Sequence, residues 1–442
     1  MKQVIEFNNT ADVFSIDYEG RGVARINGKT VFIKGALPNE RVAFRLIRSK
    51  KQFDEAEAVS IIRPSEERVA PKCCYFNTCG GCVLQHASPR AQVAFKQRIL
   101  EEQLSRIGKV FPEQILPPVY GSAWGYRHRV RFSVSADKQG RVRVGFREKQ
   151  SHHIVAIESC PVLPMHVSAI LPGLNRLMQD FVKINGRVNY IECAVGEQLT
   201  ILNVCMQETL EKAACKLLER FSDGLNQSGG KWQIWIQHGK KAAYPLCPEN
   251  APEPAYRLPE FDVEMPFLPG DFTQINTEMN ALMVGRALRL LDARPNERVA
   301  DLFCGLGNFT LPIAKSAAEV VGLEEADYLV RRARSNAALN GCTNAKFRQT
   351  DLFATTPATV TQWGYFDKML LDPPRAGAYA VTQALHAPYL PKRIVYVSCN
   401  PSTLARDAAV LAGKGYCFKA AGVINMFAQT AHVESIAWFE LH

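Results

Sequence analysis

One stretch in the C-terminal half, residues 298–311 (RVADLFCGLGNFTL), constrains the fold more than any other part of the chain. An apolar segment leads through Asp301 into a turn with two glycines, Gly305 and Gly307, and a helical pattern follows directly. A strand that passes through a glycine turn into a helix is the building unit of doubly wound α/β sheets. Because strand and helix patterns alternate from there to the end of the chain, we expect a doubly wound sheet over residues 266–442.

The carboxyl end of that sheet carries a pattern that favours a nucleoside ligand. The next apolar strand, residues 320–323, ends at Glu324, which lies 19 residues after Gly305. An acid about 20 residues after the turn is placed to bind the hydroxyls of an adenosine ribose. The third glycine of the dinucleotide fingerprint is absent, because residues 309–310 are Phe-Thr. That difference favours S-adenosylmethionine over NAD; a tight turn without a ligand is the alternative.

A further strand of the expected sheet runs into a rigid acidic turn. Residues 366–371 continue into Asp-Pro-Pro-Arg, in which two prolines fix the direction of Asp372. Methyltransferases that modify exocyclic amines follow their Asp-Pro-Pro with an aromatic residue that stacks on the base. This chain has Arg375 at that position, which argues against N-methylation.

A cysteine ends the strand after that. Residues 393–398 (RIVYVS) lead to Cys399, and the helical pattern that follows begins with Asn400. We expect Cys399 to be partly exposed beside a helix N-terminus, two features that lower a thiol pKa and favour the thiolate. A buried structural cysteine is the alternative. The position of Cys399 at the ligand end of the sheet favours a nucleophile.

A thiolate beside a methyl donor suits methylation at a pyrimidine carbon. Carbon 5 of a pyrimidine is a weak nucleophile, but addition of a thiolate at carbon 6 gives carbon 5 carbanion character. A base must then remove the proton from carbon 5 so that the thiol can leave. Residues 426–434 (MFAQTAHVE) contain the candidate base, Glu434, and a rival, His432. A surface carboxylate and a structural histidine are the alternatives.

Three motifs together resemble the bacterial RNA uracil-C5 methyltransferases: Asp-Pro-Pro-Arg at 372–375, Cys-Asn-Pro at 399–401 and Gln-Thr-x-His-Val-Glu at 429–434. The resemblance runs over nearly the whole chain. It implies a Rossmann-like S-adenosylmethionine methyltransferase domain with Cys399 as nucleophile and Glu434 as base. It also implies contacts to S-adenosylmethionine from six side chains: Gln274, Phe303, Asn308, Glu324, Asp351 and Asp372.

The chain departs from that family pattern at three positions. Asn425 and Ala428 stand where family members usually carry Asp and Pro, in the loop before Glu434. Asp351 stands where close relatives often carry an amide. None of these departures touches the core chemistry.

Residues 1–62 predict about five short strands joined by tight turns. Asn-Gly at 27–28 is a strong hairpin signal, and so many short strands suggest a small closed barrel like the oligonucleotide-binding folds. Residues 20–25 and 35–38 resemble a TRAM domain. Basic and aromatic side chains interleave there, as suits a phosphate backbone with stacked bases. We nevertheless expect most of the aromatic side chains to fill the barrel interior: Phe14, Tyr18, Phe32, Phe44 and Phe53.

Four of the 13 cysteines lie in a compact, irregular loop, and three of them form a C-x5-C-x2-C pattern that starts at Cys73. Cys160, in a Ser-Cys-Pro sequence, is the candidate fourth ligand, because Cys-Pro is common at iron–sulfur ligands. Four thiolates could instead hold zinc, and unligated reduced cysteines are the remaining alternative. The family resemblance favours a [4Fe-4S] cluster, with Cys74 ranked behind Cys73 as a ligand. The predicted ligands are Cys73, Cys79, Cys82 and Cys160.

Residues 63–265 are expected to form a central α+β domain that carries this loop. Within it, residues 91–107 have apolar side chains at helical spacing, and we expect this helix to pack on the C-terminal domain. The basic strand at 127–131 (RHRVR) either follows phosphates or is a solvated strand face.

Charge and composition bear on partner and location. The 53 Lys and Arg against 43 Asp and Glu leave a formal net charge of +10, which fits an anionic partner or an ordinary basic protein. We expect a cytoplasmic monomer with reduced cysteines and no membrane association, because no secretory signal and no long apolar run is evident. The tRNA-directed sisters of the family typically lack both the barrel and the cysteine cluster. Their joint presence therefore points to 23S rRNA.

Four rival functions remain open. A tRNA uridine-C5 methyltransferase would share all the chemistry. An RNA cytosine-C5 methyltransferase is disfavoured, because Arg375 stands where it would carry a second cysteine. A radical enzyme is disfavoured, because its C-x3-C-x2-C pattern is absent. A non-catalytic RNA-binding assembly factor would not need Cys399, Glu434 and Asp372 together.

Overall fold

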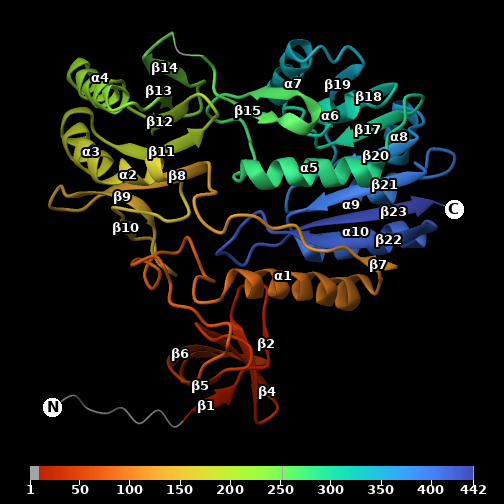
Figure 1. Cartoon of the computed structure of the whole chain (residues 1–442), viewed down its shortest axis with the longest axis horizontal. Helices are drawn as coiled ribbons and strands as arrows, with labels where there is room; N and C mark the ends of the chain where they lie inside the picture. The colour runs from red at the N-terminus through yellow and green to blue at the C-terminus, as the bar shows by residue number, and fades with distance from the viewer. Residues whose placement is uncertain (1–8, 251, 442) are drawn as a thin grey trace.

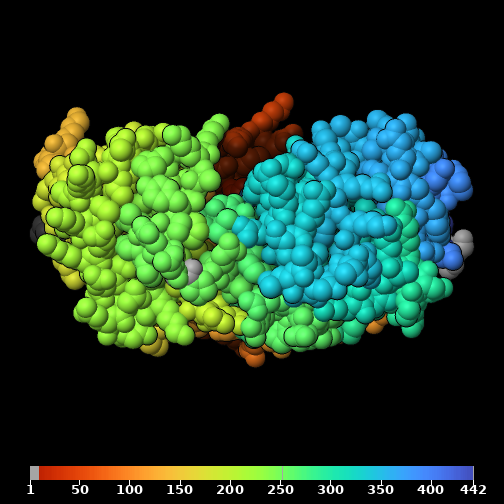
Figure 2. Space-filling view, turned by 90° about the horizontal axis from the view of Figure 1, so that it is seen from above, coloured from red at the N-terminus to blue at the C-terminus, as the bar shows by residue number. Residues whose placement is uncertain are grey.

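The computed structural model describes residues 9–250 and 252–441, which form three regions (Figure 1). An N-terminal barrel, drawn in red, lies below helix α1. A yellow-green central region and a cyan-blue C-terminal region lie side by side above it. Seen from above, the last two form the two halves of an elongated molecule (Figure 2). No helix in the described ranges is long and apolar enough to cross a membrane.

The N-terminal barrel is one six-stranded sheet in the order β1-β5-β6-β4-β3-β2. Its interior is aliphatic, with Val31, Ile33 and Val42 among its buried side chains. Asn27 and Gly28 both have positive φ, 49° and 80°, as a two-residue hairpin turn between β3 and β4 requires. The strands are β1 (Thr10–Asp12), β2 (Ser15–Ile16), β3 (Gly22–Ile26), β4 (Lys29–Lys34), β5 (Arg41–Ser49) and β6 (Phe53–Arg63).

The prediction that most aromatic side chains fill this barrel is wrong. Phe44 is buried, but Phe14 and Tyr18 are 54% and 64% exposed. Phe32 and Phe53 are half-buried and pack edge to face, with ring centroids 5.4 Å apart. The interior of so small a barrel is already filled by aliphatic side chains, so the larger rings lie outside it.

Helix α1 (Pro89–Gln103) continues as the short π-helix η1 (Leu104–Gly108). The Ser88 side chain caps α1 by accepting a hydrogen bond from the Ala91 N–H at 3.2 Å. Ile99, Leu100 and Leu104 lie in a core shared with the C-terminal sheet. The helix therefore belongs by its packing to the C-terminal region, although it comes before the central one in sequence.

The central region is a seven-stranded mixed sheet with helices on one face, in the order β10-β9-β8-β11-β12-β13-β14. Met178 and Phe181 of α3 and Leu218 of α4 are fully buried in its core. Its strands are β8 (Arg129–Ala136), β9 (Val142–Arg147), β10 (Ile154–Ala156), β11 (Val188–Val195), β12 (Thr200–Met206), β13 (Trp232–His238) and β14 (Tyr244–Cys247). Its helices are α2 (Met165–Ala169), α3 (Leu171–Asn185) and α4 (Lys212–Gln227).

A two-stranded ribbon connects the central and C-terminal regions. It consists of β15 (Ala255–Leu258), the 3-10 turn η2 (Pro259–Phe261) and β16 (Val263–Pro266). Leu258 and Met265 pack into the C-terminal core. By packing, the boundary of the C-terminal region thus lies about ten residues before the predicted residue 266.

The C-terminal region is an eight-stranded sheet in the order β19-β18-β17-β20-β21-β23-β22-β7. Strands β17 to β21 pair in parallel, whereas β23 is antiparallel to both β21 and β22. The strands are β7 (Gln114–Ile115), β17 (Arg298–Leu302), β18 (Glu319–Glu324), β19 (Ala345–Gln349), β20 (Lys368–Leu371), β21 (Arg393–Ser398), β22 (Tyr416–Ile424) and β23 (Glu434–Leu441). The expected doubly wound sheet is present.

Helices cover both faces of this sheet. Met283 of α5 and Val330 of α7 belong to one core, and Val381 of α9 and Leu404 of α10 belong to the other. The strand order reverses at β17, which places a crevice at the carboxyl ends of β17 and its neighbours. The helices are α5 (Thr277–Leu291), α6 (Thr310–Ala314), α7 (Asp327–Leu339), α8 (Pro357–Trp363), α9 (Tyr379–Ala384) and α10 (Pro401–Gly413).

Candidate active site

A cavity of about 480 Å³ opens at the carboxyl ends of β17, β18, β20 and β21. This is the reversal point of the strand order, where doubly wound sheets bind their ligands. The first residue of β23, Glu434, also lines the cavity. The cavity brings together seven of the predicted site residues: Gln274, Phe303, Asn308, Glu324, Asp372, Cys399 and Glu434.

The turn after β17 and the tip of β18 form one wall. The Glu324 carboxylate accepts hydrogen bonds from the N–H groups of Gly305 at 3.1 Å and Ala326 at 3.0 Å. Phe303 has a φ of 64°, a left-handed conformation that is costly for a bulky residue and is typical of ligand sites. Its ring lies 5.7 Å from that of Phe353, centroid to centroid. Acidic and aromatic groups thus face the cavity together.

Asn308 is held by side chains from two other elements. It exchanges two hydrogen bonds with Asn280 of α5, at 2.8 and 2.9 Å, and accepts one from the Tyr256 hydroxyl at 2.9 Å. Because both polar atoms of the Asn308 amide are engaged, its orientation is set before any ligand binds.

The loop that carries Gln274 is fastened to the central region. Arg129 donates to the Thr273 hydroxyl at 3.2 Å and pairs with Glu192 at 2.6 Å. The His128 N–H donates to the Ile275 carbonyl at 2.7 Å. Part of the predicted basic strand therefore braces the cavity, and Arg129 is engaged in an ion pair within the protein.

Asp351 is the one predicted contact that does not line the cavity. It is exposed, and its carboxylate accepts hydrogen bonds from the N–H groups of Phe353 and Ala354, at 2.9 and 3.1 Å. Its neighbour Phe353 lines the cavity instead. In this structure Asp351 shapes the loop after β19, so its contact to S-adenosylmethionine stays a prediction.

Antiparallel pairing brings Cys399 and Glu434 together. Strands β21 and β23 end in the paired residues Ser398 and Ser435, and the Ser435 hydroxyl donates to the Ser398 carbonyl at 3.2 Å. Cys399 and Glu434 are each one residue beyond that pair, so they face each other across the strand ends. Residues 35 positions apart in sequence thus share one wall of the cavity.

The expectation that the environment of Cys399 lowers its thiol pKa is wrong. Burial raises the pKa of Cys399 to about 12, and the nearby Glu434 and Asp372 carboxylates raise it further than Arg375 lowers it. The position before α10 is as predicted, but burial and two anions outweigh the helix N-terminus. In the ligand-free protein this group is therefore a thiol.

The two carboxyl groups of the cavity also have raised pKa values. Burial, followed by the charge of Asp372, raises the pKa of Glu434 well above its usual range, and Glu434 is only 3% exposed. Burial raises the pKa of Asp372 to about 7. The cavity gathers several acidic groups against one arginine, Arg375, so a positively charged ligand would further stabilise their ionised forms.

Arg375 and His432 form the rim of the cavity near Cys399. An Arg375 nitrogen lies 3.2 Å from His432 Nδ1, and Asn400 donates to the Arg375 carbonyl at 3.0 Å. Burial and Arg375 lower the pKa of His432. Burial thus acts on the two candidate bases in opposite directions: it raises the pKa of Glu434 and lowers that of His432.

Sequence analysis missed several apolar side chains that line the cavity. They come from the ribbon, from the loop between β16 and α5, from the turn after β17, from α7 and from the loop after β19, and none belongs to a reactive motif. Phe353 lies two residues after the predicted contact Asp351, and this closeness in sequence was the one signal that could have placed Phe353 at the cavity. The main members are Tyr256, Phe272, Leu306, Leu329 and Phe353.

The cysteine loop packs against the β9–β10 hairpin of the central region. The Gly80 N–H donates to the Arg147 carbonyl at 2.9 Å, and Cys79 pairs with Glu148 in an isolated β-bridge. Cys160 follows β10 and is buried. The tertiary structure thus brings the loop to the predicted fourth cysteine.

We call Cys73, Cys79, Cys82 and Cys160 the thiol cluster. Burial raises the pKa of the Cys160 thiol to about 12, and the charges of the other three thiols raise it as well, so all four lie near one another. Cys74 is exposed. Within residues 9–250 and 252–441, however, no group of three or more His, Cys, Asp or Glu side chains is arranged to hold a metal ion.

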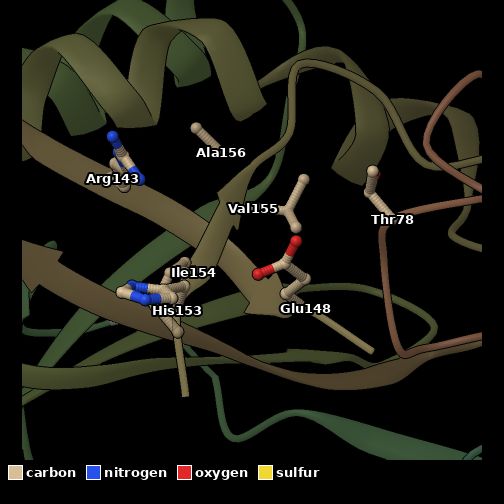
Figure 3. A pocket seen from close by; sticks show the side chains of 7 residues that line it. All are labelled: Thr78, Arg143, Glu148, His153, Ile154, Val155 and Ala156. Atoms are coloured by element: carbon tan, nitrogen blue, oxygen red, sulfur yellow. The ribbon is translucent and has the colours of Figure 1, made fainter. Parts of the chain in front are cut away.

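A second hollow lies beside this loop, against the edge strand β10 (Figure 3). Thr78, Arg143, Glu148 and His153 line it, and Figure 3 shows their side chains around the backbone of Ile154 to Ala156. None of the predicted site residues lines this hollow.

Fold and cavity together define an S-adenosylmethionine-dependent methyltransferase. The solved structure of Pyrococcus abyssi tRNA (uracil-54, C5)-methyltransferase in complex with S-adenosyl-L-homocysteine has the same fold. Its TM-score is 0.73 at 23% identity, over 97% of this chain and 99% of that one. The family profile described as tRNA (Uracil-5-)-methyltransferase matches residues 94–441, and that of the TRAM domain matches residues 10–59. The chain belongs to the tRNA (uracil-5-)-methyltransferase family, as its motifs predicted, and its barrel is a TRAM domain.

Curated relatives match the chain from end to end. A protein of Neisseria lactamica named 23S rRNA (uracil(1939)-C(5))-methyltransferase RlmD is 55% identical, over 98% of this chain and 96% of its own length. Proteins of the same name from Nitrosospira multiformis and Thiobacillus denitrificans are 50% and 49% identical, over 96% and 98% of this chain and 97% and 100% of their own lengths.

The Pyrococcus abyssi structure bears on one argument from the sequence. It aligns with 97% of this chain, yet that enzyme is named for a tRNA. The barrel alone therefore does not distinguish an enzyme for rRNA from one for tRNA.

Proposed function

We propose that the protein methylates carbon 5 of a uridine in 23S rRNA, with S-adenosylmethionine as the methyl donor. The observation that carries the chemistry is the pairing of Cys399 and Glu434 at adjacent strand ends, in one cavity with Asp372. The rRNA substrate is supported by relatives that carry this activity in their names and are 48–55% identical over nearly the whole chain.

Cys399 begins the reaction by adding its sulfur to carbon 6 of uracil. The carbon 5–carbon 6 π pair moves toward the carbonyl at carbon 4, and the resulting enolate makes carbon 5 nucleophilic. Carbon 5 then attacks the donor's methyl group, and the electron pair of the broken carbon–sulfur bond stays on the donor's sulfur. The Glu434 carboxylate takes the proton from carbon 5, the double bond re-forms, and Cys399 leaves as the thiolate.

The raised pKa values of Cys399, Glu434 and Asp372 in the ligand-free site are compatible with these steps, because binding of the donor changes the charge in the cavity. Bound S-adenosylmethionine supplies an electrophilic methyl group and a positive charge within the cavity. A cation there favours the ionised forms of Cys399, Glu434 and Asp372, which burial disfavours in its absence. A raised carboxyl pKa also makes Glu434 a stronger base once it is ionised.

The donor contacts follow from the two walls of the cavity. Glu324, at the tip of β18, would accept hydrogen bonds from the ribose hydroxyls, and the Phe303 ring would pack on the adenine. Gln274, Asn308 and Asp372 would bind the polar atoms of the methionine part.

We also propose that the thiol cluster holds a [4Fe-4S] cluster. One buried thiol, Cys160, is coupled to three partly buried ones, which suits a metal group because cations stabilise the thiolates. The cysteines would hold the loop to the central sheet, and no step of methyl transfer uses them. Because Cys74 is exposed, Cys73 is the better ligand.

The RNA must present its target base out of any stack, because Cys399 lies inside a cavity. Exposed Phe14 and Tyr18 on the TRAM barrel supply rings for unpaired bases. One copy of the chain contains all the candidate residues, so a monomer acting on rRNA in the cytoplasm suffices for the reaction.

The test is methyl transfer from labelled S-adenosylmethionine to unmodified 23S rRNA, 16S rRNA and tRNA. We expect label in 23S rRNA, recovered as 5-methyluridine. Label confined to tRNA would support the proposed chemistry but would show that the substrate is tRNA and not 23S rRNA. Tight RNA binding without label in any RNA would favour the assembly factor.

A further inference from the structure

Lys96 is a buried lysine whose ammonium group has neutral hydrogen-bond partners. It is fully buried on α1, and Nζ donates to Asn425 Oδ1 and to the Phe427 carbonyl, each at 2.8 Å. The described residues contain one other buried lysine, Lys368, and its ammonium group pairs with Glu297 at 2.9 Å. A buried cation without a carboxylate is costly to maintain, and burial lowers the pKa of Lys96 to about 7. Such a group points to a functional role.

The turn that Lys96 contacts leads directly into the cavity. Residues 425–433 connect β22 to β23, which begins with Glu434, and the turn at 425–430 is the first part of that connection. The Phe427 ring lines the cavity and packs edge to face on His432, with centroids 5.6 Å apart. Lys96 therefore fixes the backbone from which two cavity side chains, Phe427 and Glu434, are presented.

Other side chains from outside the sheet brace the same turn. Gln92, one helical turn before Lys96, exchanges two hydrogen bonds with Gln429, at 2.9 and 2.8 Å. The Tyr126 hydroxyl donates to the Ala428 carbonyl at 2.6 Å. Residues four apart lie on one face of a helix, so α1 presents Gln92 and Lys96 to the turn together.

We propose that Lys96 is a positioning residue for the proton-removal step, because it holds the 425–430 turn so that Glu434 faces carbon 5 of the bound uracil. The inference rests on the proposed uridine methylation. Without Nζ, the Phe427 carbonyl and the Asn425 amide lose their buried donor, and the turn relaxes. Cys399 enters from β21 and α10, so its attack and the methyl transfer continue. The methylated adduct then persists, because the electron pair of the carbon 5–hydrogen bond is not released to re-form the double bond.

The experiment compares Lys96→Met with the wild-type protein and with Glu434→Gln on an RNA fragment that contains the target uridine. Lys96→Met keeps the length of the side chain and removes its charge. We expect kcat to fall at least about tenfold, with KM for S-adenosylmethionine within about twofold. A denaturing gel should show covalent protein–RNA complex accumulating, as with Glu434→Gln. Lys419→Met is the matched control, since it removes a lysine that pairs with Glu113, away from the turn.

Three variants that alter Asn425 keep the test decisive if Lys96→Met folds poorly. Asn425→Asp supplies a carboxylate partner, so it should retain activity in the presence of Lys96. Lys96→Met/Asn425→Asp should be less active than either single variant, because a carboxylate is then buried without its cation. Asn425→Ala removes one acceptor and should give a smaller loss than Lys96→Met.

The outcomes separate the two proposals. Wild type without methylated product would overturn the proposed function. The role of Lys96 alone would be overturned if the wild type forms product and Glu434→Gln accumulates adduct as expected, but Lys96→Met does not behave as proposed. Lys96→Met would then either keep its kcat or lose it without accumulating adduct.

Discussion

The two cysteine sites of this molecule have opposite surroundings. Cys399 stands alone at the end of β21, in a cavity with the carboxyl groups of Asp372 and Glu434. The thiol cluster gathers its four sulfurs with one another, and the charge of Lys149 lowers the pKa of Cys79 against the effect of burial. A thiol that lies beside carboxyl groups can exchange protons with them. Several thiols that lie beside one another can together bind a metal as thiolates. The neighbours of a cysteine thus decide its chemistry.

The largest expected effect distinguishes the nucleophile from the thiol cluster. Cys399→Ala should reduce methyl transfer by at least about 10⁴-fold, because the other thiol that lines the cavity, Cys304, is only 4% exposed and burial raises its pKa well above the usual range. Its melting temperature should stay close to that of the wild type, since the side chain is only half-buried. Labelled S-adenosylmethionine and unmodified 23S rRNA measure the first quantity, and a thermal melt measures the second. Substantial activity in the alanine variant would remove Cys399 from the mechanism.

The carboxyl groups beside Cys399 predict a marked pH dependence. Cys399 and Glu434 act in their deprotonated forms, and their environment raises both pKa values. The active fraction therefore grows as pH rises, so kcat/KM should increase with pH between about pH 6 and 7.5. The measurement is kcat/KM for RNA at saturating donor. A rate that falls over this range would show that a protonated group is required instead.

The thiol cluster should affect stability more than chemistry. Cys160→Ser removes one buried ligand, so we expect loss of iron and sulfide and a fall of about 3 kcal/mol in the free energy of unfolding. Methyl transfer at low temperature should decrease by less than about tenfold, because no step uses these thiols. Iron analysis, absorbance and thermal melts report the result, with Cys74→Ser as the exposed control. Equal metal content in Cys160→Ser and wild type would contradict the assigned ligands.

The smallest expected effect reports how strongly the central region stabilises the turn before the candidate catalytic base, Glu434. The Tyr126 hydroxyl, from the segment before β8, donates to the Ala428 carbonyl in the turn before Glu434. Tyr126→Phe should cost about 1 kcal/mol of stability and lower kcat a few-fold. Tyr75→Phe is the control, because its hydroxyl accepts from the Glu158 N–H outside the cavity. Identical kinetics in the two variants would show that the two regions act independently.

Much of the candidate site could be predicted because its residues follow local rules. Glu324, Asp372 and Cys399 each end a strand, and the ends of parallel strands meet at one edge of a sheet. The failures have a common cause. The pKa of Cys399 depends on burial and on carboxylates from other strands, and the aromatic side chains of the barrel depend on how much room the aliphatic core leaves. Neither quantity is local.

By itself, the sequence determined the order of strands and helices in the C-terminal region, the family and the reactive residue types. Strand and turn patterns depend on neighbouring residues, so a single chain contains that information. Only the tertiary structure decided which residues meet. The antiparallel β21–β23 pair sets Glu434 beside Cys399, and the packing of α1 places Lys96 under the turn that leads to Glu434. Those contacts join residues between 35 and more than 300 positions apart, and no local pattern specifies them.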